Sequence, residues 1–254
     1  MILGVIRGMA DIVGACRRMV AIIAAAVATM VTLAGCDMFA SETLRYRLTV
    51  EVETPKGLRS GSSVIESRVK PSGPLSAVAV NYTYRGEAVA VDLPGGQTLF
   101  ALLTSETGDV DAPNRYPAAA FADRLPKTFP GTYPWLESHA AIRKLGGTGE
   151  LIRSGPDESG EPRNPYPLLV RFRDLADPAS VEAVDPDDLA ASFGPGYRLR
   201  RITVQITDDP VTTGIEKRLG WVRTVSKKDF PPKFQPPGIP VGDFVGLFSK
   251  EISQ

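Results

Sequence analysis

The stretch LRYRLTVEVET, residues 44–54, decides the fold of this chain. Apolar side chains stand at positions 44, 46, 48, 50 and 52, and Arg, Thr or Glu stands at each position between them. Because side chains alternate between the two faces of a strand, this period of two predicts a strand with one buried and one solvated face. The outward face mixes Arg and Glu, which is typical of a solvated sheet face rather than a binding stripe.

Further strands are predicted on both sides of this stretch in the sequence. Thr54-Pro55-Lys56-Gly57 has the composition of a tight turn, and Ser63–Val69 is expected to form the next strand. Tyr197–Thr207 alternates again, but the parity of its apolar residues changes at Arg200-Arg201. One extra residue there, a β-bulge, reconciles the two halves of that strand.

The region 75–93 predicts a hairpin. If Arg85-Gly86 forms a two-residue loop, Tyr82 lies opposite Val89 and every large apolar side chain falls on one face. Gly86 tolerates the positive φ of such a loop, whereas Arg85 suits it less, so a bulged turn is the alternative.

Two more apolar segments and three short helices complete the expected elements. Gln97–Leu103 is almost continuously apolar, which indicates a strand buried on both faces, and Leu168–Arg173 predicts another short strand. Helices are expected at Ala118–Leu125, at Pro134–Leu145 and after Asp185, which is the expected N-cap with Gly194 as the stop. The expected buried stripe of the second helix consists of Trp135, Ala141, Ile142 and Leu145.

Pro and Gly are abundant, with 22 and 24 residues, which favours many turns and short strands over long helices. The predicted class is therefore mainly β, a β-rich α+β fold. We expect an antiparallel sheet or sandwich with two or three short helices in the connections.

An uncharged run from Met19 ends in Leu33-Ala34-Gly35-Cys36. Arg17 and Arg18 precede the run, so the segment has the basic, apolar and small-residue parts of a secretory signal. Leu33-Ala34-Gly35-Cys36 resembles the lipobox of bacterial lipoproteins. The resemblance implies that Cys36 is lipidated on its sulfur, that residues 1–35 are removed, and that Cys36 becomes the first residue of the mature chain.

This resemblance covers only the first 36 residues. It implies a membrane as partner, attached through acyl chains such as palmitate on Cys36, with the body on the periplasmic side of the cell envelope. Asp37 favours the inner membrane, and the outer membrane is the alternative. An uncleaved anchor also stays open, because the 18 residues from Met19 to Cys36 meet the lower limit for a spanning helix. Translation starts at Met1 or at Met9.

The charge balance argues against nucleic acid as a partner. Because Arg7, Arg17, Arg18 and Asp11 lie in the leader, the mature chain keeps 26 basic and 28 acidic residues, a net charge of −2. No charge excess steers the whole body to nucleic acid, and no binding motif for it occurs.

Residues for catalysis or metal binding are few. The only cysteines are Cys16 in the leader and Cys36, so the body has no disulfide, thiolate metal site or redox pair. His139 is the only histidine, which excludes sites that need two, and we expect it at the surface or half-buried. Asp109 and Asp111 lack the ordered pattern of a calcium loop. No catalytic residue, metal ligand or cofactor is assigned.

The mature chain divides into a tether at 36–43, a mostly β domain at 44–226, and a Pro-rich segment at 227–254 expected to pack on that domain. A subdivision near the loop 155–167 is the alternative.

The expected function is a membrane-anchored envelope lipoprotein that acts as a non-enzymatic binding or scaffold module. One alternative is a periplasmic hydrolase or carbohydrate-active enzyme using Asp174, Asp177 and Asp187, if their carboxylates converge. Asp187 also fits a structural role at the positive end of the helix after Asp185. The other alternative is a subunit of a larger envelope assembly that uses the Pro-rich segment.

Overall fold

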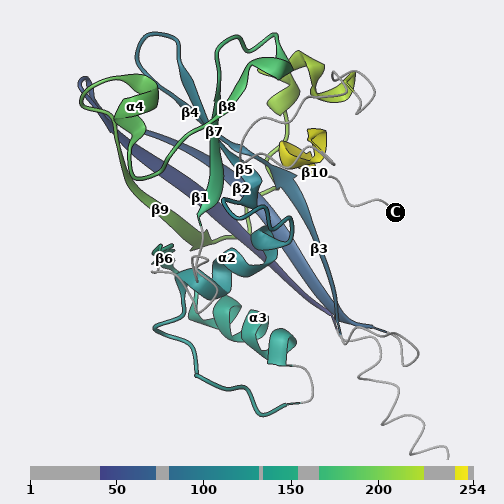
Figure 1. Cartoon of the computed structure of the whole chain (residues 1–254). Coiled ribbons are helices and arrows are strands. Elements are labelled where there is room, and N and C mark those ends of the chain that lie inside the picture. The colour runs from purple at the N-terminus through teal and green to yellow at the C-terminus, as the bar shows by residue number, and fades with distance from the viewer. Residues whose placement is uncertain (1–40, 73–79, 132–133, 154–165, 226–243, 251–254) are drawn as a thin grey trace, which may run out of the picture.

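The computed structural model describes residues 41–72, 80–131, 134–153, 166–225 and 244–250. The leader with its lipobox, the tether up to residue 40, most of the loop 155–167 and the Pro-rich stretch 227–240 lie outside these residues. Within them, the chain forms two antiparallel sheets with three α-helices in the connections (Figure 1). The predicted mainly β class is confirmed.

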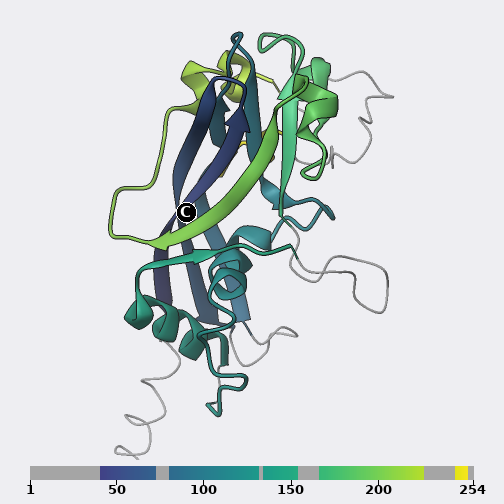
Figure 2. The ribbon, with the colours of Figure 1, turned by 90° about the vertical axis from the view of Figure 1, so that its left-hand side faces the viewer.

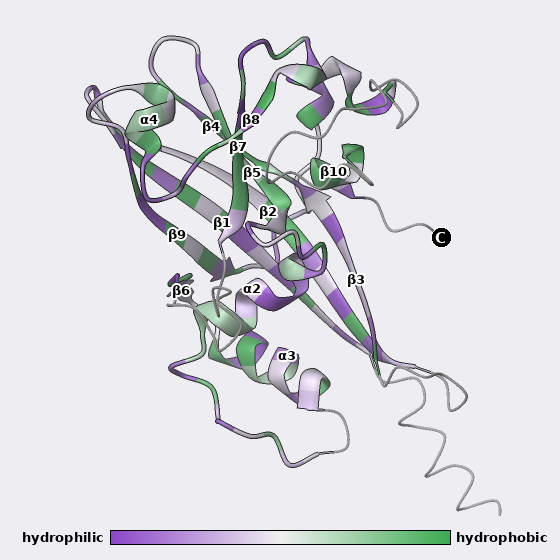
Figure 3. Ribbon diagram, viewed as in Figure 1, coloured by the Kyte–Doolittle hydropathy of each residue, from purple (hydrophilic) through white to green (hydrophobic). Residues whose placement is uncertain are grey.

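The larger sheet has six strands in the order β10-β3-β2-β1-β9-β6. Its central strands are long: β1 has 13 residues and β2 has 15. Buried apolar and more exposed polar residues alternate along β1, and Figure 3 shows the mixture of both kinds on this sheet. The strands of this sheet are β1 (Glu42–Thr54), β2 (Gly57–Pro71), β3 (Val80–Glu87), β6 (Thr148–Glu150), β9 (Arg198–Ile206) and β10 (Ser249–Lys250).

The hairpin between β1 and β2 turns at the predicted residues. Thr54 pairs with Gly57, which adopts a φ of 96°. The Thr54 hydroxyl accepts a hydrogen bond from the Lys56 N–H at 3.2 Å and donates one to the Gly57 carbonyl at 2.7 Å. The composition of the turn therefore fixes the register of the two longest strands.

The predicted bulge in β9 is confirmed. Glu51 of β1 pairs with Arg201, but the next residue, Val52, pairs with Leu199, so Arg200 is the extra residue. The bulge keeps Leu199 and Ile202 facing the same core although their positions differ in parity.

The smaller sheet has the order β4-β5-β7-β8. All eight side chains of its central strand β5 are buried, which confirms the expectation for the apolar stretch that begins at Gln97. Its strands are β4 (Val89–Asp92), β5 (Thr98–Ser105), β7 (Pro167–Phe172) and β8 (Val181–Ala183).

The predicted hairpin around Arg85-Gly86 is wrong. β3 pairs with β2 and β10, and β4 pairs with β5, so the chain crosses from one sheet to the other at Ala88 instead of folding back. The alternation of apolar residues fits the predicted hairpin and the observed crossing equally well, because one face of β3 and one face of β4 are buried in either case. Gly86 has a φ of 152°, and this glycine lies against Ile65, where a Cβ would come within 3.0 Å of the Ile65 side chain.

Glu87 holds the crossing point in place. Its carboxylate is buried and accepts hydrogen bonds from the Gly214 N–H at 2.8 Å and the Ile215 N–H at 2.9 Å. Burial raises the pKa of Glu87, and the two N–H donors oppose that shift. These bonds tie the segment after β9 to the place where the chain changes sheets.

Two hydrophobic clusters lie on opposite faces of the smaller sheet. Leu99, Ala101 and Leu103 of β5 face the first cluster, which also contains the apolar face of β1. Phe100 and Leu102 face the second cluster. Short 3₁₀ helices and the chain's last described residues cover that second face, at Ile215–Lys217, Gly220–Arg223 and Val245–Leu247.

Aromatic rings fill the second cluster. Trp221 stacks on Phe244 with ring centres 5.8 Å apart and meets Phe248 edge-on at 5.4 Å. The described residues 244–250 are therefore packed on the smaller sheet through Phe244, Leu247 and Phe248.

Helices α2 (Ala112–Ala120) and α3 (Pro134–Leu145) lie beside the lower part of the larger sheet in Figures 1 and 2, and the smaller sheet lies beside its upper part. Helix α3 has the predicted bounds, but its buried residues are Leu136, His139 and Ile142. Of the predicted stripe, only Ile142 is fully buried, and Trp135 and Leu145 are exposed.

The other two helices differ from prediction at their starts. Helix α2 begins at Ala112, six residues before the expected start, because Pro113 fits the first turn of a helix. Helix α4 (Leu189–Phe193) is capped by Asp188, whose carboxylate accepts the Ala191 N–H, and not by Asp185. Gly194 ends α4 with a φ of 101°, as expected.

Replacement of Gly61 tests the packing of β4 over β2. A Cβ there would lie 2.0 Å from the Ala90 carbonyl oxygen, so Gly61→Ala forces the two strands apart. We expect a loss of about 1–3 kcal/mol of unfolding free energy in denaturant titration, the usual cost of overpacking. Gly220→Ala is the matched control, because its Cβ meets nothing within 4 Å. Equal stability of the two variants would contradict the close approach.

Candidate functional site

The lipobox residues Leu33, Ala34, Gly35 and Cys36 lie outside the described residues, and so does Asp37. The first described residue is Ser41, and β1 starts immediately after it at Glu42. Among the described residues, no helix combines the length and apolar character needed to cross a membrane.

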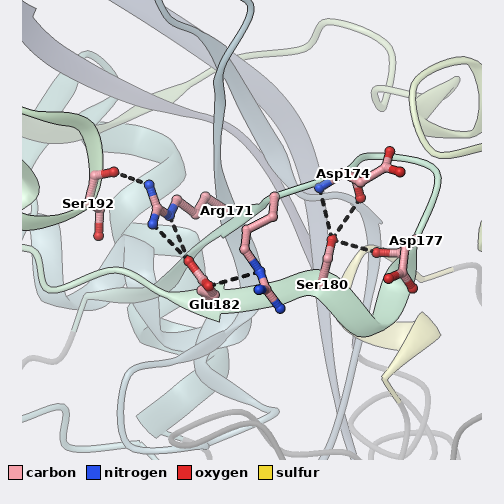
Figure 4. A network of polar contacts seen from close by, with 7 residues as sticks. Arg171, Asp174, Asp177, Ser180, Glu182 and Ser192 are labelled. Carbon is pink, nitrogen blue, oxygen red and sulfur yellow. Dashed lines mark hydrogen bonds and ion pairs between the residues drawn. The ribbon is translucent and has the colours of Figure 1, made fainter.

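Two of the three candidate carboxylates stabilise one tight turn. Asp174 accepts the Ala176 N–H and Asp177 accepts the Ala179 N–H, both at 2.9 Å. Ser180 completes the turn, because its hydroxyl lies 2.8 Å from the Asp174 carbonyl and 2.7 Å from the Asp177 carbonyl (Figure 4). These are the local bonds of Asx turns, and both aspartates are exposed.

The third carboxylate, Asp187, has a different partner. It forms an ion pair with Arg153, which also lies 2.9 Å from Glu106. The charged pair beside the turn in Figure 4 consists of Arg171 and Glu182, 3.0 Å apart on β7 and β8. No group of three His, Cys, Asp or Glu residues that could hold a metal occurs in the described part of the chain. The structure therefore brings Asp174 and Asp177 together in one turn and gives Asp187 a separate partner, Arg153.

His139 is buried, with 5 % of its surface exposed, so the expectation of a surface or half-buried histidine is wrong. Its Nδ1 lies 3.1 Å from the Trp135 carbonyl oxygen, and its Nε2 lies 3.3 Å from the Ser67 hydroxyl. Ser67 also donates to Asn114 Oδ1 at 2.8 Å. Residues of β2, α2 and α3 thus meet in one buried polar cluster.

The group beside each ring nitrogen of His139 shows which nitrogen carries the proton. A carbonyl oxygen only accepts, so Nδ1 of His139 carries the proton of the neutral ring. Nε2 then lies without a proton beside the Ser67 hydroxyl, whose single proton goes to Asn114 Oδ1. Burial lowers the pKa of His139, and the bond to the Trp135 carbonyl opposes that shift. The neutral ring is therefore the favoured form in the folded protein.

A hydroxyl beside an imidazole also has the composition of a nucleophile and its base. A nucleophile must reach a substrate, however, and Ser67 has none of its surface exposed. What the cluster does in this fold is attach α2 and α3 to β2. Sequence reasoning missed it because Ser67 and His139 are 72 residues apart, although Ser63 and Ser67 at core-facing positions of β2 are an unusual pattern.

The outer face of the larger sheet carries paired charges. Glu66 lies between two arginines on neighbouring strands and accepts from Arg45 at 2.6 Å and from Arg85 at 3.2 Å. Burial works to raise the pKa of Glu66, but the two arginines outweigh it and hold that pKa below its ordinary value. Glu51 and Glu53 likewise pair with arginines of β9. This pairing agrees with the predicted solvated face.

An open strand edge lies beside the β1–β2 hairpin. β3 pairs with β2 only from Glu66 to Pro71, and Val64 bonds instead to Thr212 through both its N–H and its carbonyl. Among the described residues, no strand pairs with positions 57–62 on the side away from β1.

The backbone of this edge is available to a further strand. Peptide groups alternate in direction along a strand, and those of Val64 point away from β1. Leu58, Ser60 and Ser62 therefore direct their N–H and carbonyl groups to the same open side. All three residues are exposed. We call positions 57–62 the free edge.

Comparison with protein-family models, with curated proteins and with solved structures finds no match to this chain.

His139 makes the stability of the fold depend on pH. Because its pKa is lower in the folded than in the unfolded chain, the unfolded chain binds the proton first as the pH falls below ~6.5. We expect the unfolding free energy to decrease from pH 7 to 5.5 and to decrease less in His139→Gln, measured by denaturant titration at each pH. Ser67→Ala keeps the imidazole and should keep the dependence; parallel profiles of all three proteins would contradict the assignment.

Proposed function

We propose that this protein is a membrane-anchored lipoprotein of the bacterial cell envelope, held by acyl chains on Cys36, that acts as a non-enzymatic binding or scaffold module. The observation that carries the anchor is the run Leu33-Ala34-Gly35-Cys36 after an uncharged stretch and a pair of arginines. Stable anchoring usually needs two lipid chains or two membrane contacts, and a lipidated N-terminal cysteine supplies the chains.

The arrangement of the body supports a module that binds away from the membrane. β1 has 13 residues, so at ~3.3 Å per residue the hairpin turn lies roughly 40 Å from Ser41. The free edge lies beside that turn. We propose that it pairs with an extended segment of a partner protein in the envelope, as strands do when they add to an open sheet edge.

Side chains around the free edge set the chemistry of that segment. Leu58 is 52 % exposed, and Lys56 and Arg59 are exposed beside it. An extended segment with acidic side chains and one apolar residue fits these groups best. The body sits on the periplasmic side, and Asp37 favours the inner membrane.

Substitution of Cys36 tests the anchor. Cys36→Ala removes the sulfur that carries the lipid, so we expect no incorporation of labelled palmitate and no cleavage of the leader. Cys16→Ala is the matched control, since that cysteine precedes the proposed cleavage site. Labelled palmitate in both variants would refute the anchor; the readout is gel autoradiography of membrane fractions.

A proline in the free edge tests the binding role. Ser60→Pro removes one N–H that faces the open side, which an edge strand tolerates but a new partner strand does not. We expect a photo-crosslinker placed at Leu58 to label a discrete partner in Ser60→Ala membranes and at least roughly tenfold less of it in Ser60→Pro, because each lost 1.4 kcal/mol weakens binding tenfold. Equal labelling in both variants would contradict the proposal.

A further inference from the structure

The start of β1 shows which end of the body the tether enters. Ser41 accepts a hydrogen bond from Arg68 of β2 at 3.4 Å, and Glu42 lies 2.9 Å from Arg143 of α3. The end of β2 and the C-terminal turn of α3 therefore flank the first described residues. We call this the anchor end: Arg68 and Lys70 belong to β2, and Trp135, Arg143, Lys144 and Leu145 belong to α3, which lies at this end of the larger sheet (Figures 1 and 2).

The tether is too short to hold this end far from a membrane. Five residue steps lead from Cys36 to Ser41, and a fully extended chain spans at most ~3.6 Å per step, or about 18 Å. If Cys36 is lipidated, which is the proposed function on which this inference rests, the anchor end lies within that distance of the lipid surface.

The anchor end has the chemistry of a surface that contacts lipid headgroups. Arg68, Lys70 and Lys144 are exposed, and among the described residues no carboxylate forms an ion pair with any of them. Cationic side chains beside a bilayer are attracted to anionic phospholipids over about a Debye length, ~8 Å at physiological salt.

Two large apolar side chains accompany these cations on α3. Trp135 is 39 % exposed and Leu145 is 48 % exposed, although the sequence predicts that both belong to the buried stripe of the helix. Tryptophan is favoured where one side of its ring is apolar and the other is wet, as at the membrane interface. The fold thus leaves an interfacial aromatic side chain exposed at the end that carries the tether.

We propose that the anchor end docks on the anionic phospholipid surface of the membrane that holds Cys36, with Trp135 in the headgroup layer. Docking adds a second contact to the lipid anchor and orients β1 outward from the membrane. The free edge at the opposite end of β1 is then presented away from the membrane.

The two tryptophans of the chain make the contact measurable. Trp221 is buried in the second hydrophobic cluster, so it serves as the internal reference. The lipidated protein with all residues from Cys36 onward is reconstituted into vesicles of phosphatidylcholine and phosphatidylglycerol. One set of vesicles contains brominated lipid, which quenches the fluorescence of nearby tryptophan. The difference in fluorescence emission between the wild type and Trp135→Phe gives the emission of Trp135.

We expect brominated lipid to reduce the Trp135 emission roughly twofold, as for an interfacial ring, and to leave the emission of Trp135→Phe unchanged. In vesicles of phosphatidylcholine alone, quenching should decrease. The double variant Lys70→Glu, Lys144→Glu should decrease the quenching of Trp135 in the same way. Lys56→Glu with Arg59→Glu makes the same charge change at the hairpin end and should have no effect.

Flotation of the vesicles separates the two proposals. Protein that floats with the vesicles but shows no Trp135 quenching, or quenching independent of lipid charge, overturns the docking and leaves the anchor intact. Protein that does not float overturns both the anchor and the docking that rests on it. The docking is also overturned if the Lys56 and Arg59 variant loses as much quenching as the Lys70 and Lys144 variant.

Discussion

Burial of one face of β1 is the constraint on which the rest of this structure depends. Its five apolar side chains are at most 1 % exposed, and the strand pairs with β2 along its whole length and with β9 along most of it. A face roughly 40 Å long needs more than one covering layer. The smaller sheet covers one part, and the helices cover the other, where the Tyr46 hydroxyl reaches the Pro113 carbonyl at 2.6 Å.

The second layer exists because the chain leaves the first sheet at Ala88. Once β4 lies over β2, with the Ala90 carbonyl against Gly61, β5 becomes the centre of a sheet with two buried faces. The second of those faces needs its own cover, which the aromatic cluster around Trp221 and Phe248 provides. Glu87 stabilises the crossing by binding the segment that leads to this cover.

The same crossing shapes the surface available for function. Because β3 leaves β2 after pairing with Glu66, the backbone beyond Val64 lacks a neighbouring strand on that side among the described residues. On the other long side of the sheet, β9 carries the exposed charged side chains of Arg198 and Arg200, and charged residues on a strand near an edge discourage pairing with a further chain. The body therefore has two distinct ends, one at the tether with exposed cations and Trp135, and one at the hairpin with an open edge.

The sequence by itself determined the elements whose cause is local: β1 by its alternation, the turn at Thr54–Gly57 by its residues, the bulge at Arg200 by its change of parity, and α3 by its proline start and glycine stop. The resemblance at Cys36 is local as well. Only the tertiary structure decided that β3 and β4 belong to different sheets, since alternation records which face is buried and not which strand is the neighbour. It also decided that His139 is buried against Ser67 and that Trp135 is exposed, because both depend on contacts between residues far apart in the chain.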